Sequence, residues 1–248
     1  MAKIIAIANH KGGVGKTTSV ASIGAILANG GYRTLIIDLD SQANLTRSFL
    51  EEEPEDTIYK ALKGYISLPI LNLKENLDIV CSSLEMGGVE LELSEMNNRE
   101  FILKGLLEPL QDKYDYVLLD CPPSLGIVTL NALVAATELY VPMLAETLPS
   151  IGLQTIEDII EMTQENLNSN ISLSGIIITR WRTTNLTKMI EEQIRETFGD
   201  IVFNTKIRDN ITIAEAPLFL KDIITHAPRS NGAKDYQSLT TEIISRFK

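Results

Sequence analysis

The feature that most constrains the fold is a glycine-rich run with two lysines, Lys11-Gly12-Gly13-Val14-Gly15-Lys16-Thr17-Thr18. Residues 4–8, just before it, form an apolar run with the length of a buried strand, and residues 17–29 carry apolar side chains at helical spacing. The run is therefore expected to form a loop that leads from a strand into a helix. Unpaired backbone N–H groups and the helix dipole attract phosphate at such a position, so the sequence predicts a phosphate-binding loop.

The residue types in this loop suit a nucleoside triphosphate. Glycines at positions 12, 13 and 15 allow successive backbone N–H groups to face phosphate oxygens without interference from a side chain. Lys16 is expected to face the β- and γ-phosphates, and the hydroxyl of Thr17 to bind Mg²⁺. The full pattern G-x-x-x-x-G-K-[ST] requires glycine where this chain has His10, so only the core of the motif matches. A tight turn without a ligand is the structural alternative, and Thr18 also fits as an ordinary helix residue.

The composition indicates a soluble protein with one domain over residues 1–248. Hydrophobic residues make up 44% of the chain and the mean hydropathy is +0.07. No apolar run approaches the about 18–20 residues that a membrane helix needs, and no signal segment is evident before the first strand. Cys81 and Cys121 are too few for a disulfide framework or a zinc site. We therefore expect a cytoplasmic protein without stable membrane insertion.

Apolar segments alternate with helix-like segments along most of the chain. This pattern predicts an α/β fold, a doubly wound, mostly parallel sheet with helices on both faces. Nearly all of the expected strands are apolar without alternation, as in strands that are covered on both sides. Strands are expected at residues 3–9, 33–38, 77–81, 116–120, 138–143, 174–179 and, briefly, 201–204. Helices are expected at residues 17–29, 99–111, 127–136, 153–166, 186–198 and 233–247.

Aspartates follow two of these apolar strands. The strand at residues 33–38 ends in Asp38, and Asp40 follows two residues later. Ligands of open α/β sheets bind beyond the carboxyl ends of the strands, so one of the two can enter the site while the other stays structural. Capping of the next helix would also explain both. The strand at residues 116–120 ends in Asp120, which is expected to hold Mg²⁺ directly or through water. Pro122-Pro123 then imposes a rigid turn.

The lysine-rich loop resembles the deviant Walker A motif of the ParA/MinD family of P-loop ATPases. Residues 132–136, the Ile-Ala-Glu-Ala-Pro segment at 213–217 and the His-Ala-Pro segment at 226–228 resemble the ParA/Soj-type partition ATPases. The resemblance extends through most of the chain. It implies a P-loop NTPase fold and slow, Mg²⁺-dependent hydrolysis of ATP.

The resemblance also implies roles for individual residues. Lys16 would serve the nucleotide of its own subunit, whereas Lys11 would reach across a dimer interface to the nucleotide of the partner subunit. Asp40 would position the attacking water. The expected catalytic residues are therefore Lys11, Lys16 and Asp40. The D-x-P-P segment that begins at Asp120 would act as a nucleotide-sensing switch. The expected surroundings of Mg²⁺, partly through water, are Thr17, Asp120 and Asp38.

The expected contacts of the nucleotide come from two segments. In the family, an I-P-R-N segment before A-E-A-P lies against adenine, and the corresponding residues here are 207–210. Arg208 replaces the proline, so a backbone contact is what remains expected there. Residues 179–183 also depart from the family pattern, and no role is carried over to them. The nucleotide-binding residues expected are Lys11, Gly12, Gly13, Val14, Gly15, Lys16, Thr17, Thr18, Arg208 and Asn210.

Charge is distributed unevenly along the chain, whose net charge is −11. The first 179 residues carry 11 Lys and Arg against 24 Asp and Glu, whereas residues 180–248 carry 11 against 9. An acidic chain binds DNA only where its basic residues gather on one face, because affinity comes largely from neutralising phosphates. The resemblance implies non-specific DNA binding through C-terminal basic residues. The candidates are Arg180, Arg182, Lys188, Arg208, Lys221 and Arg229, each of which also fits as a solvated surface charge.

The function implied by the resemblance is a nucleotide switch in plasmid or chromosome partition. It would form a homodimer with ATP, bind DNA at the nucleoid and be stimulated by a ParB-like centromere-binding protein. A MinD-like ATPase that cycles on a membrane is one alternative, although residues 235–248 carry few cations for a membrane-binding helix. A nucleotide-dependent adaptor for conjugation or secretion is another. A metabolic ATPase of the same superfamily is a third, but metal-ligating cysteines for it are not evident.

Overall fold

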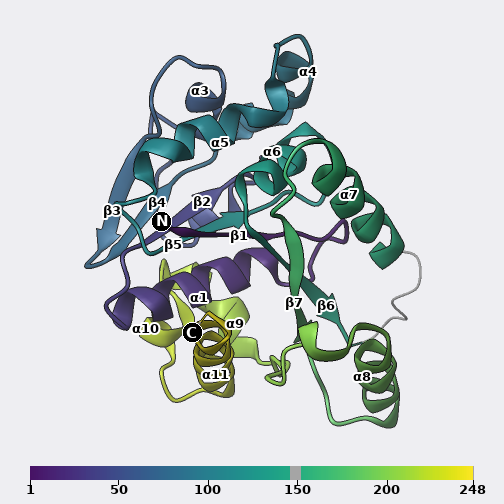
Figure 1. The fold of residues 1–248 in the computed structure, drawn as a ribbon. Helices are drawn as coiled ribbons and strands as arrows, with labels where there is room; N and C mark the ends of the chain where they lie inside the picture. The colour runs from purple at the N-terminus through teal and green to yellow at the C-terminus, as the bar shows by residue number, and fades with distance from the viewer. Residues whose placement is uncertain (146–151, 248) are drawn as a thin grey trace.

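The centre of the fold is one seven-stranded sheet, in a computed structural model that describes residues 1–145 and 152–247. The strand order is β3-β4-β2-β5-β1-β6-β7, and only the β3–β4 pair is antiparallel (Figure 1). This confirms the predicted mostly parallel α/β sheet. The strands are β1 Lys3–Ile7, β2 Thr34–Asp38, β3 Ile70–Lys74, β4 Leu77–Val80, β5 Tyr116–Asp120, β6 Glu138–Leu144 and β7 Ser172–Thr179.

Helices cover both faces of the sheet and bury a separate apolar cluster on each (Figure 1). One face carries α1 Lys16–Asn29, α2 Asn44–Arg47, α9 Ile211–Glu215, the 3₁₀ turn η5 Ala216–Phe219, α10 Ile223–His226 and α11 Asn231–Arg246. The other face carries α3 Ile58–Leu62, α4 Val89–Ser94, α5 Ile102–Leu107, α6 Ile127–Ala135, α7 Gly152–Asn166 and α8 Asn185–Phe198. No helix among the described residues is long and apolar enough to cross a membrane.

The central strands are apolar throughout because successive side chains enter opposite clusters. In β1, Ile4 and Ala6 pack into the cluster under α3–α8, whereas Ile5 and Ile7 pack into the cluster under α1 and α11. The approach of α1 to the sheet is very close. A Cβ on Gly24 would lie 2.6 Å from Cγ2 of Ile36 in β2, so only glycine fits at this point of the helix.

The strand order brings the predicted site residues together. β5 lies between β1 and β2, and its Asp120 is in register with Ile7 on one side and with Asp38 on the other. The loop at residues 8–15 leaves the carboxyl end of β1, while Asp38 and Asp40 lie at the carboxyl end of β2. All three segments therefore meet at one edge of the sheet, as expected for a parallel α/β fold.

Two expected elements are corrected by the structure. The helix expected at 99–111 is divided into a 3₁₀ turn at Arg99–Phe101, α5 and a second 3₁₀ turn at Glu108–Leu110. Pro109 is the second residue of that turn, and its missing N–H prevents continuation of the α-helix. The strand expected at 201–204 is only a single bridge between Val202 and Ile176.

Several short elements of the structure have no clear signal in the sequence. β3 is an edge strand with mostly half-exposed or exposed side chains, so it lacks the apolar run that identified the central strands. The short helices α2, α3, α4, α9 and α10 contain four to six residues each. Helices of this length show too few turns for a helical period to be recognised.

Candidate functional site

The glycine-rich run forms the predicted loop at the N-terminus of α1. Gly13 and Gly15 have φ values of 71° and 93°, in the left-handed region that favours glycine. Lys16 is the first residue of α1, and its ammonium donates to the carbonyl oxygens of Asn9 at 3.2 Å and Lys11 at 3.3 Å. Burial lowers the pKa of Lys16, and the neighbouring carboxylate of Asp120 opposes this effect. The ammonium of Lys16 therefore lies at the centre of the loop, bound to two of its carbonyl oxygens.

Two side chains outside the motif hold the loop in place. The amide of Asn9 donates to the carbonyl of Pro142 at 2.7 Å and accepts from the backbone N–H of Lys11 at 3.0 Å. The hydroxyl of Thr179, at the end of β7, lies 2.9 Å from the carbonyl oxygen of Val14. No local pattern predicts the contacts of Asn9 with Pro142 or of Thr179 with Val14, because each joins residues more than a hundred positions apart.

Asp120 is buried at the end of β5, and neither of its carboxylate oxygens has a hydrogen-bond partner of good geometry among the described residues. Burial raises its pKa well above the usual range, the charge of Asp38 adds to this, and the nearby hydroxyl of Thr17 opposes it. An unsatisfied buried carboxylate is costly unless a cation or donor completes it. A cation bound between Asp120 and Thr17 would do so, and these two oxygen donors fit Mg²⁺.

Asp38 is engaged differently. Its Oδ2 accepts from both the backbone N–H and the hydroxyl of Thr46 at 2.8 Å, and its Oδ1 accepts from the N–H of Asp40 at 3.1 Å. Burial raises its pKa to about 6 despite these bonds. Asp38 thus connects β2 to α2 beneath the site, and both of its oxygens are occupied within the protein. Its predicted place in the metal shell remains a prediction.

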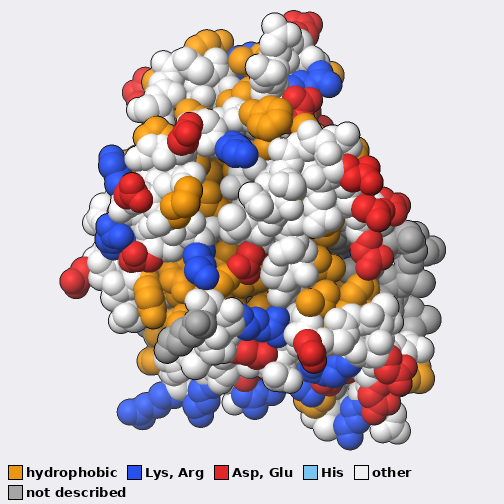
Figure 2. All heavy atoms as spheres, in the orientation of Figure 1, with side chains coloured by type: hydrophobic (Ala, Val, Ile, Leu, Met, Phe, Trp, Pro, Cys, Tyr) orange, Lys and Arg blue, Asp and Glu red, His pale blue; other side chains and the backbone are white. Residues whose placement is uncertain are grey.

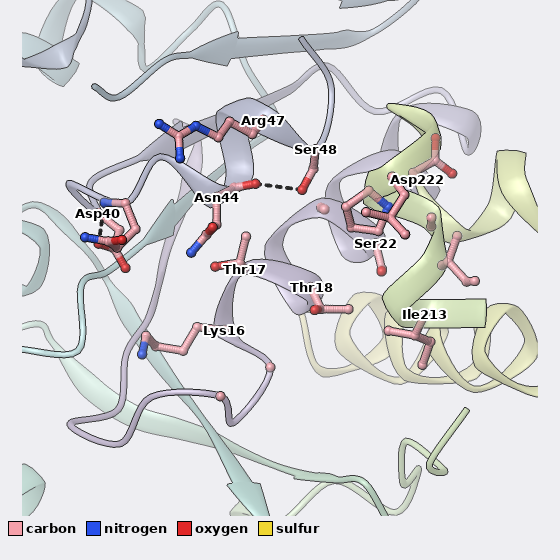
Figure 3. Close-up of a pocket in the computed structure, with 18 of the residues that line it drawn as sticks. Lys16, Thr17, Thr18, Ser22, Asp40, Asn44, Arg47, Ser48, Ile213 and Asp222 are labelled. Atoms are coloured by element: carbon pink, nitrogen blue, oxygen red, sulfur yellow. Dashed lines mark hydrogen bonds between the residues drawn. The ribbon is translucent and has the colours of Figure 1, made fainter. Parts of the chain in front are cut away.

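Asp40 lines a cavity of about 640 Å³ together with Lys16 and Thr17. Figure 3 shows this cavity along α1, between α2 on one side and α9 and α10 on the other. One carboxylate oxygen of Asp40 accepts from the N–H of Gln42 at 3.0 Å, which orients the side chain. Because Asp40 shares the cavity with the phosphate loop, its position fits a residue that orients water beside a bound phosphate.

The structure also places Arg47 and Lys221 at this cavity. Sequence reasoning missed Arg47, whose guanidinium pairs with Glu53 at 2.7 Å, because nothing in its local pattern distinguishes it from a surface charge. Lys221 was predicted to contact DNA, but it lies on the wall of the cavity that holds the phosphate loop.

A second cavity, of about 430 Å³, adjoins the other side of the loop. Its lining includes Gly15 and Thr18 as well as Arg208 and Asn210, so the predicted base-binding segment lies beside the loop, and its contact with the base stays a prediction. The amide oxygen of Asn210 accepts from the N–H and hydroxyl of Thr212, so the oxygen is committed within the protein.

The basic candidates for DNA binding are partly paired with acids. Arg182 and Arg180 both approach Asp209, at 2.6 and 3.9 Å, and Arg208 pairs with Asp235 at 2.6 Å. Lys188 and Arg229 have no ion pair within the described part of the chain. Figure 2 shows Lys and Arg along the lower edge of the molecule with acidic side chains beside them. The pairing weakens the positive potential that DNA binding needs.

A metal site made by protein side chains alone is not evident: no group of three His, Cys, Asp or Glu in the described segments could hold an ion. Cys81 and Cys121 are buried, and burial raises the pKa of both thiols, which disfavours the thiolate form that a nucleophile needs.

The loop, the buried lysine and the two carboxylates at neighbouring strand ends define a P-loop nucleoside triphosphatase of the two-lysine type. Residues 2–173 match a family model described as an AAA domain. The chain is 38% identical to the sporulation initiation inhibitor protein Soj of Bacillus subtilis, over 98% of each chain. It is also 38% identical to the chromosome-partitioning ATPase Soj of Treponema pallidum, over 99% of this chain and 98% of the relative.

A solved structure with a bound nucleotide is similar over the whole chain. Cobyrinic acid a,c-diamide synthase from Mycobacterium smegmatis, with an ATP analogue and magnesium, has a TM-score of 0.87 and 30% identity, and the match covers 100% of this chain and 96% of that one. The chain belongs to the ParA/Soj family and is a Mg²⁺-dependent ATPase. The resemblance recognised in the sequence is thereby confirmed.

Proposed function

We propose that this protein is a partition ATPase that switches between states with its bound nucleotide. In the ATP state it forms a homodimer and binds DNA without sequence specificity, and a ParB-like partner stimulates hydrolysis. The main observation in support is that the loop with two lysines lies beside the unsatisfied carboxylate of Asp120. The Soj relatives, similar over nearly the full chain, support the partition role. One domain, in the cytoplasm at the nucleoid, would carry out the cycle.

Hydrolysis needs positioned charge rather than a covalent intermediate. The backbone N–H groups of residues 12–16 and the ammonium of Lys16 bind the phosphate oxygens and stabilise their increasing charge. Thr17 and Asp120 would hold Mg²⁺, which supplies further charge neutralisation at the β- and γ-phosphates. Asp40 orients the water that attacks the γ-phosphorus as its bond to the ADP oxygen breaks.

The C-terminal helix favours partition over membrane cycling. α11 buries Tyr236, Leu239 and Ile243 in the cluster shared with α1. An amphipathic helix binds a membrane through its apolar face, which α11 uses for packing within the protein. The membrane-cycling alternative therefore has less support, and the adaptor remains the competing function.

DNA binding at several salt concentrations, with ATP, ADP and no nucleotide, tests the proposal. The Asp40→Ala variant, expected to bind ATP without hydrolysing it, holds the ATP state during the measurement. Binding should require ATP, should not depend on sequence, and should weaken steeply with salt, by a slope of about −0.9 per phosphate neutralised.

Two variants locate the surface. Arg229→Glu should weaken binding, whereas Lys113→Glu, an exposed charge on the loop before β5, should change it less than about twofold. Absence of binding at low salt in the ATP state would contradict the partition role and favour the adaptor.

A further inference from the structure

The phosphate loop is held from outside its own sequence by two buried side chains that reach the same strand. Asn9 donates to the carbonyl of Pro142. The hydroxyl of Thr179 lies 3.1 Å from the carbonyl of Met143, the next residue of β6, and 2.9 Å from the carbonyl of Val14. The hydroxyl has one proton, which is shared between these two carbonyl oxygens or donated to one of them at a time, whereas the amide of Asn9 donates to β6 independently.

The contact of Thr179 determines where an N–H group of the loop points. In a planar trans peptide unit, the C=O of one residue and the N–H of the next point in opposite directions. With the Val14 carbonyl directed at Thr179, the N–H of Gly15 faces the other side of the loop. Gly15 needs its positive φ of 93° to continue into α1 from this orientation. The hydroxyl therefore favours one rotation of the Val14–Gly15 peptide, which would otherwise rotate more freely because a glycine follows it.

The contact of Asn9 acts at the start of the loop. Its amide oxygen accepts the N–H of Lys11 while its amide nitrogen is held by β6. Both Asn9 and Thr179 are buried, at 6% and 3% exposure, so water competes little for these hydrogen bonds. The loop is consequently fixed at its first residue and in its middle.

We propose that Thr179 and Asn9 are positioning residues for ATP: they hold the phosphate loop in its binding geometry before the nucleotide arrives. Neither residue belongs to the glycine-rich motif. Their role is to reduce the ordering that phosphate binding would otherwise require, which strengthens binding of ground state and transition state alike. The expected signature is a change in KM with kcat largely preserved.

Thr179 also lines the cavity on the base side of the loop, so the test must separate the two contacts. Inorganic tripolyphosphate serves as the probe, because it carries the phosphates of ATP without ribose or base. Its affinity reports on the phosphate loop alone, and it is measured by competition with a fluorescent ATP analogue alongside ATP itself.

Thr179→Val removes the hydroxyl at nearly constant volume, and Thr179→Ser keeps it. We expect Thr179→Val to raise Kd for tripolyphosphate and for ATP by about tenfold each, the equivalent of a single hydrogen bond. The KM for ATP should rise similarly while kcat changes less than about threefold, and Thr179→Ser should remain within about threefold of the wild type. A matched control is Thr163→Val, since the buried hydroxyl of Thr163 has no partner within the described part of the chain.

Three results would overturn the proposal. The first is that Thr179→Ser weakens binding as much as Thr179→Val. The second is that Thr179→Val lowers the affinity for ATP but not for tripolyphosphate, which would mean that Thr179 contacts the adenine base and does not position the phosphate loop. Asn9→Ala provides the second, independent arm and remains informative if Thr179→Val does not fold. It should also weaken tripolyphosphate about tenfold, and an unchanged affinity in a folded Asn9→Ala variant is the third contrary result.

Discussion

At the scale of single residues, Asp38 and Asp120 show how neighbours of the same type can differ. They are in register on adjacent strands and both are fully buried. Asp38 accepts three hydrogen bonds from α2 and its own turn, whereas Asp120 has no partner of good geometry in the described structure. Asp38 therefore stabilises the fold, whereas the buried, unsatisfied carboxylate of Asp120 destabilises it until a ligand binds there.

This difference leads to a prediction for Asp120→Asn in the absence of nucleotide and Mg²⁺. Burial raises the pKa of Asp120 in the folded state above its unfolded value of about 3.9. The folded wild type therefore holds this proton more tightly, so the contribution of Asp120 to stability is fully present below about pH 4 and is lost as the pH rises through its folded-state pKa. Asp120→Asn has no titrating group at this position and does not lose this contribution. The Tm of the variant should therefore exceed that of the wild type by a margin that grows as the pH rises.

Thermal unfolding at pH 5 and pH 8 checks this. The margin at pH 8 should be a few degrees, since about 1 kcal/mol corresponds to about 2–4 °C in a chain of this size. The same variant should bind Mg²⁺-ATP more weakly. A margin that shrinks toward pH 8 would show that Asp120 is not buried as a costly charge.

How much of the site could be read from sequence depends on how local the signal is. Lys16 and Asp120 were predictable because each follows an apolar strand in a short pattern. Asn9 and Thr179 were not, because their roles depend on contacts with distant strands. The pairing of Arg208 with Asp235 was likewise invisible, since these residues come together only through the fold.

At the scale of elements, the packing of α1 on the sheet places the phosphate loop. The apolar runs of the central strands and of α1 were predicted, since both faces of those strands are buried. The edge strand β3 and the division at Pro109 were not, because one lacks an apolar run and the other is a local interruption inside an apolar pattern. Prediction succeeded where burial is continuous, as also in the edge strand β7, and failed at the exposed strand β3 and at the interruption by Pro109.

Gly24 provides a prediction for this packing. Gly24→Ala should destabilise the protein by about 1–3 kcal/mol, because the new Cβ would lie 2.6 Å from Ile36 and overpack the contact. The matched control is Gly105→Ala in α5, where the new Cβ would have no atom of another element within 4 Å. It should stabilise the protein by about 0.5–1 kcal/mol through helix propensity alone. Urea unfolding measures both, and equal effects of the two substitutions would contradict the close approach.

At the scale of the whole molecule, the two lysines of the loop have different proposed roles: Lys16 binds the nucleotide of its own subunit, and Lys11 that of a partner subunit. Lys16 is buried at the centre of the loop, whereas Lys11 is exposed. If Lys11 serves the nucleotide of a partner subunit, the active site is complete only in the dimer, and hydrolysis depends on protein concentration as well as on ATP.

Lys11→Ala should therefore weaken ATP-dependent dimerisation by at least about tenfold while nucleotide binding by the monomer changes less than about threefold. Sedimentation velocity with and without ATP measures the first, and a fluorescent ATP analogue measures the second. Lys104→Ala, which removes an exposed lysine on α5, is the control. Equal losses of dimerisation and nucleotide binding would make Lys11 a local phosphate ligand.

The contacts of Lys16 have a consequence for the timing of the cycle. Its ammonium donates to the carbonyls of Asn9 and Lys11, so a bound phosphate would replace these acceptors while Asn9 and Thr179 hold the loop. Capture of a new nucleotide then requires no refolding step, and reloading should be limited by diffusion and by departure of the product. The time between successive cycles would then be set by ATP hydrolysis and its stimulation, and not by the binding of a new nucleotide.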